Sequence, residues 1–291
     1  MKKLLLLLTT LFVVFALAAC GGGNAKEEAT GENQEGTTEQ TESTEPVKLV
    51  VGAANIPHSE ILEQAKPILA EKGIEIEIVP FQDYILPNKA LNDKELDANY
   101  FQHIPYLEAQ KKEFGYDFVS VGGIHIEPIG LYSSKYKSLD ELPEGAQIIM
   151  SNSVADHGRI LSMLEEKGLI KLKEGVEKTV ATVDDIVENP KKFEFMTDVE
   201  PGLLPQVFKN GEGDAVLINA NFALDAGLDP AKDPIAVESG ENNPYANVVA
   251  VRSGDENRPE IKTLVEVLQS KEIADFINET YKGAVIPVGA E

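Results

Sequence analysis

The amino-acid sequence predicts an α/β protein of two lobes, the second inserted into the first, each with a mainly parallel sheet flanked by helices. Short β-branched runs alternate with helical segments of about 10 to 15 residues, a pattern typical of βαβ units. The chain has 291 residues, and 43% of them are hydrophobic, which suffices for a buried core. A turn-rich stretch at residues 138–145 separates two groups of such signals, and this division indicates the two lobes.

Residues 1–19 have the pattern of a secretory signal peptide. Lys2 and Lys3 precede an apolar run from Leu4 to Ala16, and small residues lead to Cys20, the only cysteine. Small residues before a lone cysteine resemble a bacterial lipobox, which implies cleavage before Cys20 and acylation of its thiol with fatty acids such as palmitate. The segment could also be a plain signal peptide with an incidental cysteine, or an uncleaved transmembrane helix. The apolar run is short for a transmembrane helix, because such a helix needs about 20 residues to span the membrane. We expect a lipid-anchored protein on the extracytoplasmic side of the cell membrane.

Residues 20–46 are predicted to form the lipidated N-terminus and a disordered acidic tether. The segment that follows Cys20 carries seven glutamates against one lysine and almost no large apolar residue. Such a segment cannot bury enough surface to offset its ordering entropy, and like-charge repulsion keeps it extended.

The first group of structural signals begins at residue 48. Residues 48–54 form a β-branched run that ends in small residues, and residues 57–70 carry apolar side chains at helical spacing before a stop at Gly73. Residues 74–79 alternate Glu and Ile, which is typical of a strand. On the same grounds we expect helices at 84–91 and 102–114 and strands at 118–121 and 124–132.

The second group begins with a strand at 146–150 and a helix at 160–167. Further strands are expected at 179–183, 193–196, 214–219, 235–237 and 248–251, and helices from about residue 220 to Gly227, at 261–268 and at 273–281. We assign residues 47–133 and 239–291 to lobe I and residues 134–238 to lobe II, with hinges near 131–137 and 237–241.

Composition and motifs argue against several classes of function. The net charge is −23, and it becomes −25 without Lys2 and Lys3, which argues against nucleic acid and anionic lipid as partners. With Cys20 acylated, the chain has no thiol for a disulfide or for catalysis. Because the sequence contains no G-x-S-x-G, H-E-x-x-H or phosphate-loop motif, we expect neither an enzyme nor a cofactor.

The four histidines are His58, His103, His125 and His157, and they fall in four different segments. Zinc accepts histidine and carboxylate ligands from loops, so a metal centre could be assembled from them. No two of them have the i, i+4 spacing of a helical metal site. We therefore expect hydrogen-bonding histidines and no metal.

Three polar segments lie at or near the expected carboxyl ends of strands, where open α/β sheets bind ligands: 97–103, 151–159, and Asn219 with Asn247. Arg159, expected in the opening turn of its helix, offers a planar fork that can grip a carboxylate, helped by free backbone N–H groups. Asn219 and Asn247 can each donate and accept, which suits an amino-acid head group. Tyr84 and Phe101 could wall an apolar side chain, including a thioether. The pattern predicts an amino-acid site.

At these residues the sequence resembles the NlpA-type lipoproteins, the methionine-binding components of ABC importers. The similar pieces extend from residue 48 to residue 289 in the family's order and spacing: 58–62, 83–88, 96–103, 121–130, 158–159, 186–190, 244–247 and 281–287.

The resemblance implies a two-lobed periplasmic-binding-protein fold of type II, with methionine in the cleft between the lobes. It implies that Arg159 binds the α-carboxylate and that Asn219 and Asn247 bind the head group. Tyr84, Phe101 and His103 would line the side-chain pocket. The protein would then be a receptor, by default a monomer, that delivers L-methionine to an ABC permease driven by a cytoplasmic ATPase.

The sequence departs from the family pattern at three places. Residues 151–157 lack a proline and an Asn/Thr-rich run, Phe222 replaces a tyrosine, and Asn242-Asn243 lengthens a loop. These departures leave D-methionine or a methionine dipeptide open as the ligand. Two different functions also stay open: a receptor for another solute such as a metal ion, in which histidines govern binding, and a surface adhesin or signalling lipoprotein with a vestigial cleft.

Overall fold

The computed structural model describes residues 45–289. The predicted signal peptide, the predicted acylation site Cys20 and residues 20–44 of the predicted tether lie outside the described residues. Among the described residues, no helix combines the length and the apolar character needed to cross a membrane.

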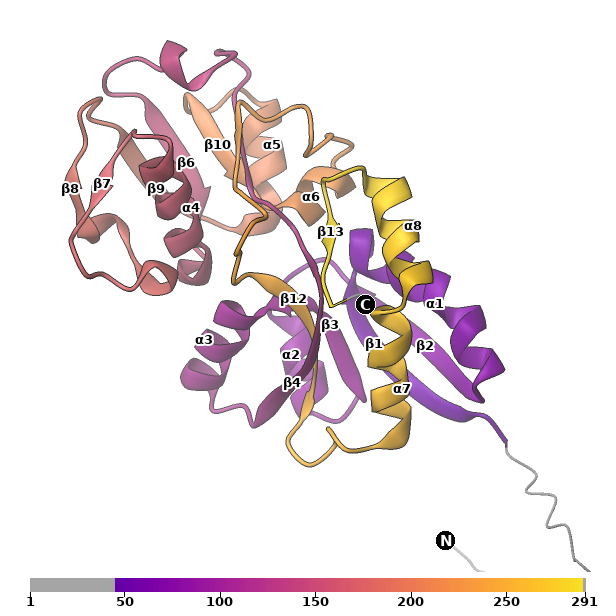
Figure 1. Cartoon of the computed structure of the whole chain (residues 1–291). Helices are drawn as coiled ribbons and strands as arrows, with labels where there is room; N and C mark the ends of the chain where they lie inside the picture. The colour runs from indigo at the N-terminus through magenta and orange to yellow at the C-terminus, as the bar shows by residue number, and fades with distance from the viewer. Residues whose placement is uncertain (1–44, 290–291) are drawn as a thin grey trace, which may run out of the picture. The chain divides into compact units, whose positions relative to one another are not determined.

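The larger sheet has six strands in the order β13-β4-β12-β3-β1-β2 (Figure 1). Its strands are β1 (Val47–Ala54), β2 (Ile74–Phe81), β3 (Ala98–His103), β4 (Phe118–Ile126), β12 (Ala246–Arg252) and β13 (Ile286–Pro287). β1 pairs parallel with β2 and β3, whereas β12 runs antiparallel between β3 and β4, and β13 is antiparallel to β4. The last part of the chain thus completes a sheet that its first part begins.

The second sheet has five strands in the order β11-β5-β10-β6-β9. Its strands are β5 (Gly130–Tyr132), β6 (Gln147–Ser151), β9 (Glu194–Val199), β10 (Ala215–Ile218) and β11 (Ala236–Val237). β6 pairs parallel with β9 and β10, and β5 pairs antiparallel with β10 and β11. A separate antiparallel pair joins β7 (Lys171–Leu172) to β8 (Ile186–Glu188).

The prediction of an α/β class is confirmed, but the sheets are mixed rather than mainly parallel. In each sheet the parallel pairs come from strands joined by helical crossovers, which parallel pairing requires. All antiparallel pairs of the two sheets except β13–β4 involve β5 or β12, the first strands after each passage of the chain between the sheets. The direction of these strands depends on partners remote in sequence, so local patterns carry no trace of it.

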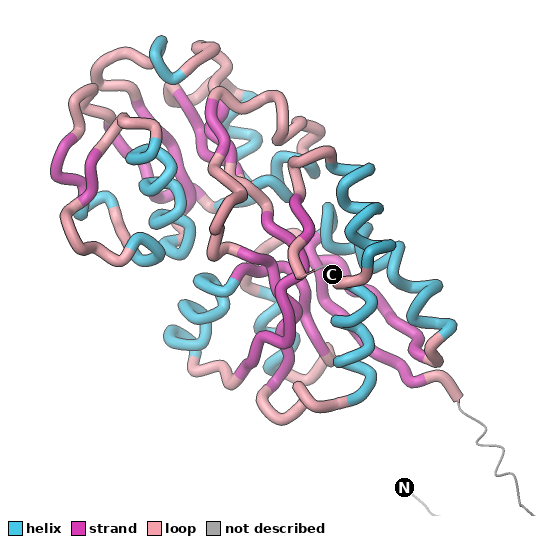
Figure 2. Tube along the Cα trace, viewed as in Figure 1, coloured by secondary structure: helices cyan, strands magenta, loops and turns pink. Residues whose placement is uncertain are grey.

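Helices cover both faces of each sheet (Figure 2). The larger sheet is accompanied by α1 (Glu60–Glu71), α2 (Leu86–Asn92), α3 (Ile104–Phe114), α7 (Pro259–Leu268) and α8 (Lys271–Tyr281), and the smaller by α4 (Val154–Glu166), α5 (Leu204–Lys209) and α6 (Ala220–Asp225). Along β12, Val249 and Val251 pack with α1, α7 and α8, while Val248 and Ala250 pack with α2 and α3. This alternation follows from the two-residue period of a strand. We call the larger sheet with its helices lobe I and the smaller lobe II.

The short helical turns are Asn55–Ser59, a π turn before α1, and the 3₁₀ turns Leu139–Glu141, Lys178–Val180, Val183–Asp185 and Pro201–Leu203. Two of these 3₁₀ turns occupy the place of the strand predicted at 179–183, so that prediction is wrong. The two strands predicted at 118–121 and 124–132 are instead β4 and the short β5. Helix α5 was not predicted.

Helix α4 begins at Val154, six residues before the predicted start. Arg159 therefore lies in the second turn of the helix and not in its opening turn, and the expected help from free helix N–H groups does not apply to it. Ser151, Asn152 and Ser153 are all suited to precede a helix, and the sequence did not reveal that the last of them is the N-cap.

The chain passes from the larger sheet to the smaller between Ile126 and Gly130, and it returns between Val237 and Ala246 (Figure 1). Strand β5 consequently belongs to the smaller sheet, although the boundary predicted at 133/134 would leave it in lobe I. These two connections, residues 127–129 and 238–245, are called the crossing segments below.

Candidate ligand-binding site

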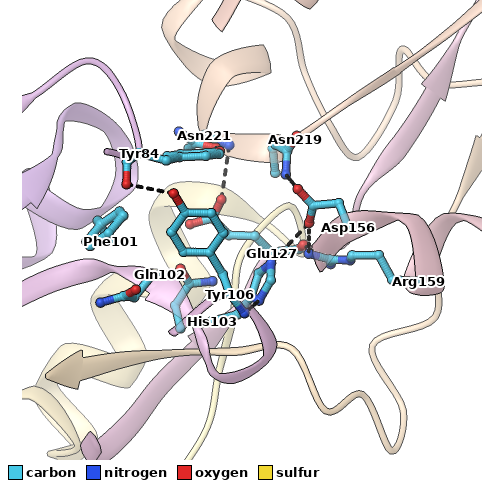
Figure 3. A pocket seen from close by; sticks show the side chains of 12 residues that line it. Tyr84, Phe101, Gln102, His103, Tyr106, Glu127, Asp156, Arg159, Asn219 and Asn221 are labelled. Carbon is cyan, nitrogen blue, oxygen red and sulfur yellow. Dashed lines mark hydrogen bonds and ion pairs between the residues drawn. The ribbon is translucent and has the colours of Figure 1, made fainter. Parts of the chain in front are cut away.

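One cavity brings together all six residues that the sequence analysis singled out. Its volume is about 380 Å³, part of which is open to solvent. It is lined by Tyr84, Phe101, Gln102, His103, Tyr106, Glu127, Asp156, Arg159, Asn219, Ala220, Asn221 and Asn247 (Figure 3). Residues 84–106 and 247 belong to lobe I, and residues 156–221 to lobe II, so the cavity lies between the lobes.

Two hydrogen bonds close the cavity by joining the lobes. The Tyr84 hydroxyl donates to Asn221 Oδ1 at 2.7 Å, and His103 Nε2 lies 3.0 Å from Asp156 Oδ1 (Figure 3). The backbone N–H of Tyr106 donates to His103 Nδ1 at 3.1 Å, so His103 caps α3. Since Nδ1 is the acceptor there, Nε2 carries the proton and donates it to Asp156.

Arg159 is buried and already holds several partners. Its Nε donates to both carboxylate oxygens of Glu238, at 3.2 and 3.0 Å, and Nη2 donates to Glu238 and to the Glu127 carbonyl oxygen, the latter at 2.6 Å. Its guanidinium carbon lies 4.6 Å from the Tyr245 ring centre, a cation–π arrangement. The guanidinium fork, which the sequence suggested would bind a ligand carboxylate bidentately, thus binds the Glu238 carboxylate instead. Among the described residues, Nη1 makes only a 3.9 Å contact with Asp156.

Asp156 was not among the predicted site residues, yet three of them meet at its carboxylate. Besides His103 and Arg159, Asn219 Nδ2 donates to its Oδ2 at 3.3 Å. Burial alone would raise the pKa of Asp156, but the His103 hydrogen bond and the Arg159 charge outweigh burial and lower it to about 2. Residues three apart share a helix face, so the i, i+3 spacing of Asp156 and Arg159 could have indicated that the two side chains meet. The predicted helix start at residue 160 left Asp156 outside the helix and hid this spacing.

A buried hydrogen-bond network forms the floor of the cavity. Glu127 Oε1 lies 2.7 Å from His125 Nε2 and 3.3 Å from His58 Nε2, and Glu127 Oε2 accepts the backbone N–H of Asn221 at 3.0 Å. His58 Nε2 also lies 3.0 Å from Asn247 Oδ1. Because both groups that face His58 Nε2 are acceptors, this nitrogen carries the proton. His58 thereby fixes the Asn247 amide with its oxygen turned toward the histidine.

The same floor could hold a metal ion by residue type. The ligand atoms of His58, His125 and Glu127 lie within 4.8 Å of one another. Burial lowers the pKa of His58 to about 4 and that of His125 to about 3, so both rings are neutral, as a metal requires. In the structure, however, His125 is hydrogen-bonded on both ring nitrogens, by Glu127 and by the Tyr100 hydroxyl.

Aromatic rings form the apolar wall of the cavity. The Tyr84 ring centre lies 6.3 Å from that of Phe101, 5.9 Å from that of Tyr106 and 4.9 Å from that of Phe222. Buried amides hold this wall in place, because Asn88 bridges α2 to Gln102 of β3 at 2.9 Å. Tyr106, missed in the sequence analysis, contributes its ring and donates its hydroxyl to the Tyr84 carbonyl oxygen at 2.8 Å.

Comparisons with known proteins agree with this architecture. The family model described as NlpA lipoprotein matches residues 49–289. The Methionine-binding lipoprotein MetQ of Bacillus subtilis strain 168 is 50% identical over 289 residues, 99% of each chain.

Two solved structures are similar as well. A putative methionine-binding lipoprotein of Bacillus subtilis is 53% identical with a TM-score of 0.81, over 83% of this chain and 98% of that one. A nutrient binding protein of Burkholderia cenocepacia bound to methionine is 42% identical with a TM-score of 0.76, over 83% and 99%. The predicted two-lobed periplasmic-binding-protein fold is confirmed. The match over nearly the whole folded part shows that the chain belongs to the NlpA lipoprotein family.

Proposed function

We propose that the protein is a non-enzymatic receptor that binds L-methionine, or a close relative of it, and delivers it to an ABC permease. The observation that carries the proposal is the cavity itself, in which head-group partners from both lobes lie beside an aromatic wall. One similar protein is named a methionine-binding lipoprotein, and another was solved with methionine bound, and both support the same ligand. In this setting the acylated Cys20 would hold the receptor at the outer side of the membrane.

The recognition chemistry follows from the groups that remain available. Nη1 of Arg159 is the free corner of the guanidinium and receives the ligand carboxylate, with the Asn247 amide nitrogen as a second donor. Tyr84 and Phe101 flank the thioether, which aromatic rings accept well. His103 lines the pocket beside them.

Closure of the lobes is the step that would report ligand to the permease. A ligand shifts an equilibrium only as far as it binds one state better than the other. The head-group partners come from both lobes, so they surround a ligand fully only in the closed arrangement that the Tyr84 and His103 hydrogen bonds hold.

Isothermal titration calorimetry on the chain without residues 1–20, unfolded and refolded to remove bound ligand, tests the proposal. We expect one-to-one binding of L-methionine, with D-methionine, Gly-Met and glutamine as comparisons. Arg159→Lys keeps the charge but not the fork, and we expect it to raise the dissociation constant at least about tenfold. Silence toward every amino acid and the dipeptide, in a protein that circular dichroism shows to be folded, would refute the proposal.

The His58–His125–Glu127 cluster favours a second candidate, a metal-ion receptor. That function requires zinc to bind without any amino acid, and His58→Ala to abolish zinc binding while Arg159→Lys leaves it intact. If calorimetry showed binding of zinc and no binding of methionine, the binding site would be assigned to the floor of the cavity and not to the aromatic wall.

A further inference from the structure

One buried carboxylate of the cavity has no close lysine or arginine partner among the described residues. Arg159 is the only lysine or arginine that lines the cavity among the described residues, and its Nε and Nη2 are taken by Glu238. Arg159 and Glu238 thus form a matched pair. Among the described residues, the Asp156 carboxylate, 1% exposed, meets no lysine and no arginine except Nη1 of Arg159 at 3.9 Å, besides its hydrogen bond with His103. A buried charge is costly unless it is paired, so this carboxylate has room for a cation.

The other acid of the cavity, Glu127, is in a different position. Its two oxygens face three donors: the ring N–H groups of His125 and His58, and the backbone N–H of Asn221. Within the part of the chain that the structure describes, the Asp156 carboxylate takes part in two hydrogen bonds, and that from Asn219 is long, at 3.3 Å. A carboxylate can accept about four, so Asp156 retains acceptor capacity and Glu127 has little.

A second acceptor without a donor lies next to Asp156. Asn219 must turn its amide nitrogen toward the carboxylate, because two oxygens would repel each other, and its Oδ1 therefore points elsewhere. That oxygen is buried and has no hydrogen-bond partner among the described residues. The cavity thus offers two adjacent acceptors, one of them charged, and a group with several N–H donors and a positive charge would satisfy both.

We propose that Asp156, together with Asn219 Oδ1, binds the α-ammonium group of the ligand and makes the cavity selective for molecules with a free α-amino group. The inference rests on the proposed function and names the head group that the same site selects. An α-amino acid carries its ammonium and carboxylate on one carbon, so their partners must lie side by side. Asp156 and the Nη1 corner of Arg159 do so, on one face of α4.

This assignment divides candidate ligands into two classes. Free amino acids, and dipeptides with a free amino terminus, carry the required cation. N-acetylated amino acids and 2-hydroxy acids do not, and they would leave the Asp156 carboxylate without its cation.

Calorimetry with two ligands and two proteins tests the proposal. The ligands are L-methionine and its 2-hydroxy analogue, which differ only in the α-substituent. We expect the wild-type protein to bind L-methionine at least about 100-fold more tightly, because the hydroxyl loses a charge-assisted hydrogen bond. In Asp156→Asn, which keeps an oxygen for His103, we expect this ratio to fall at least about tenfold, chiefly through weaker binding of L-methionine.

Glu127→Gln is the matched control, because it neutralises the other acid of the cavity. It should alter the binding of both ligands alike and leave their ratio unchanged. An unchanged ratio in Asp156→Asn, or equal loss of both ligands, would overturn the inference while the proposed function stands. Absence of L-methionine binding to the wild type would overturn both. If Asp156→Asn does not fold, the wild type still decides, since equal affinity for the two ligands would contradict the proposal.

Discussion

At the scale of single residues, Arg159 does more than the sequence suggested. The fork predicted for a ligand carboxylate contacts Glu238 and the Glu127 carbonyl oxygen, which belong to the two crossing segments. Glu238 also accepts the backbone N–H of Ile129 at 3.2 Å. Arg159 therefore ties α4 to both connections between the lobes, and its burial has a structural cause apart from any ligand.

The buried histidines predict how stability depends on pH. Burial lowers the pKa of His58 from 6.5 to about 4 and that of His125 to about 3, so on acidification the unfolded chain takes up two protons before the folded protein does. The free energy of unfolding is then greatest above pH 6.5 and decreases as the pH falls toward 4. Glu127 opposes one of these protons, because burial raises its pKa.

His58, with a pKa of 6.5 in the unfolded chain and about 4 in the folded protein, alone should lower the free energy of unfolding by about 1.5 kcal/mol between pH 6.5 and pH 5. His58→Gln removes one histidine and should flatten this dependence, whatever its stability at pH 7. Urea unfolding at a series of pH values measures both slopes. Equal slopes for the two proteins would contradict the assignment of His58 as a buried neutral ring.

Residue identities within the site could be inferred from the sequence better than their contacts. Tyr84, Phe101, His103, Arg159, Asn219 and Asn247 all line the cavity, because chemistry at strand ends and family resemblance both select such residues. Their roles as ligand contacts stay predictions. Glu127 and Asp156 could not be singled out as site residues, because acidic residues are abundant in this chain and only tertiary contacts distinguish these two.

At the scale of secondary structure, patterns confined to one segment predicted best. The Glu–Ile alternation at residues 74–79 became β2, and the apolar spacing at 261–268 became most of α7. The strand predicted at 179–183 is wrong because its β-branched residues belong to two 3₁₀ turns, and the first of these turns packs on α4, a contact that no local pattern encodes.

Gly158 makes that contact possible. A Cβ at this position would overlap the Lys178 carbonyl oxygen and lie 2.8 Å from the Thr179 carbonyl carbon. Helix propensity alone would make Gly158→Ala stabilising by about 1 kcal/mol. We expect the steric overlap to outweigh the gain in helix propensity, because the overlapping atoms belong to the backbone and cannot rotate away. The free energy of unfolding of the variant, measured with urea, should be about 1 to 3 kcal/mol lower than that of the wild type.

Glu166→Ala, an exposed change in the same helix, serves as the control and should stay within about 0.5 kcal/mol of the wild type. A Gly158→Ala protein as stable as this control would show that the turn at Lys178–Val180 can move away from α4 at little cost.

At the scale of the whole molecule, hydrogen bonds and apolar contacts join the lobes, the latter including Ala155 of α4 and Leu224 of α6 packed against lobe I. Tyr84→Phe deletes the hydrogen bond to Asn221 that joins the lobes but keeps the aromatic ring. We expect the unliganded protein to open more often, and the dissociation constant for L-methionine to rise about two- to tenfold, since one hydrogen bond contributes about 0.5 to 1.5 kcal/mol. Small-angle X-ray scattering and calorimetry measure the two effects.

Tyr106→Phe provides the comparison, because the Tyr106 hydroxyl bonds to Tyr84 within lobe I. It should leave the scattering profile of the unliganded protein unchanged. Identical profiles for Tyr84→Phe and the wild type would mean that this hydrogen bond does not govern closure.

The interleaved order of the strands also has a consequence for the synthesis of the protein. Every strand of the smaller sheet lies between residues 130 and 237, whereas the larger sheet needs β12 as the partner of both β3 and β4. As the chain elongates from its N-terminus, more than 100 residues follow β4 before β12 is synthesised. Only then can β12 take its place between β3 and β4 and pair with both. Contacts so distant in sequence close slowly. The larger sheet is therefore the later and more vulnerable part of folding, and a nascent chain that ends before residue 246 can complete only the smaller one.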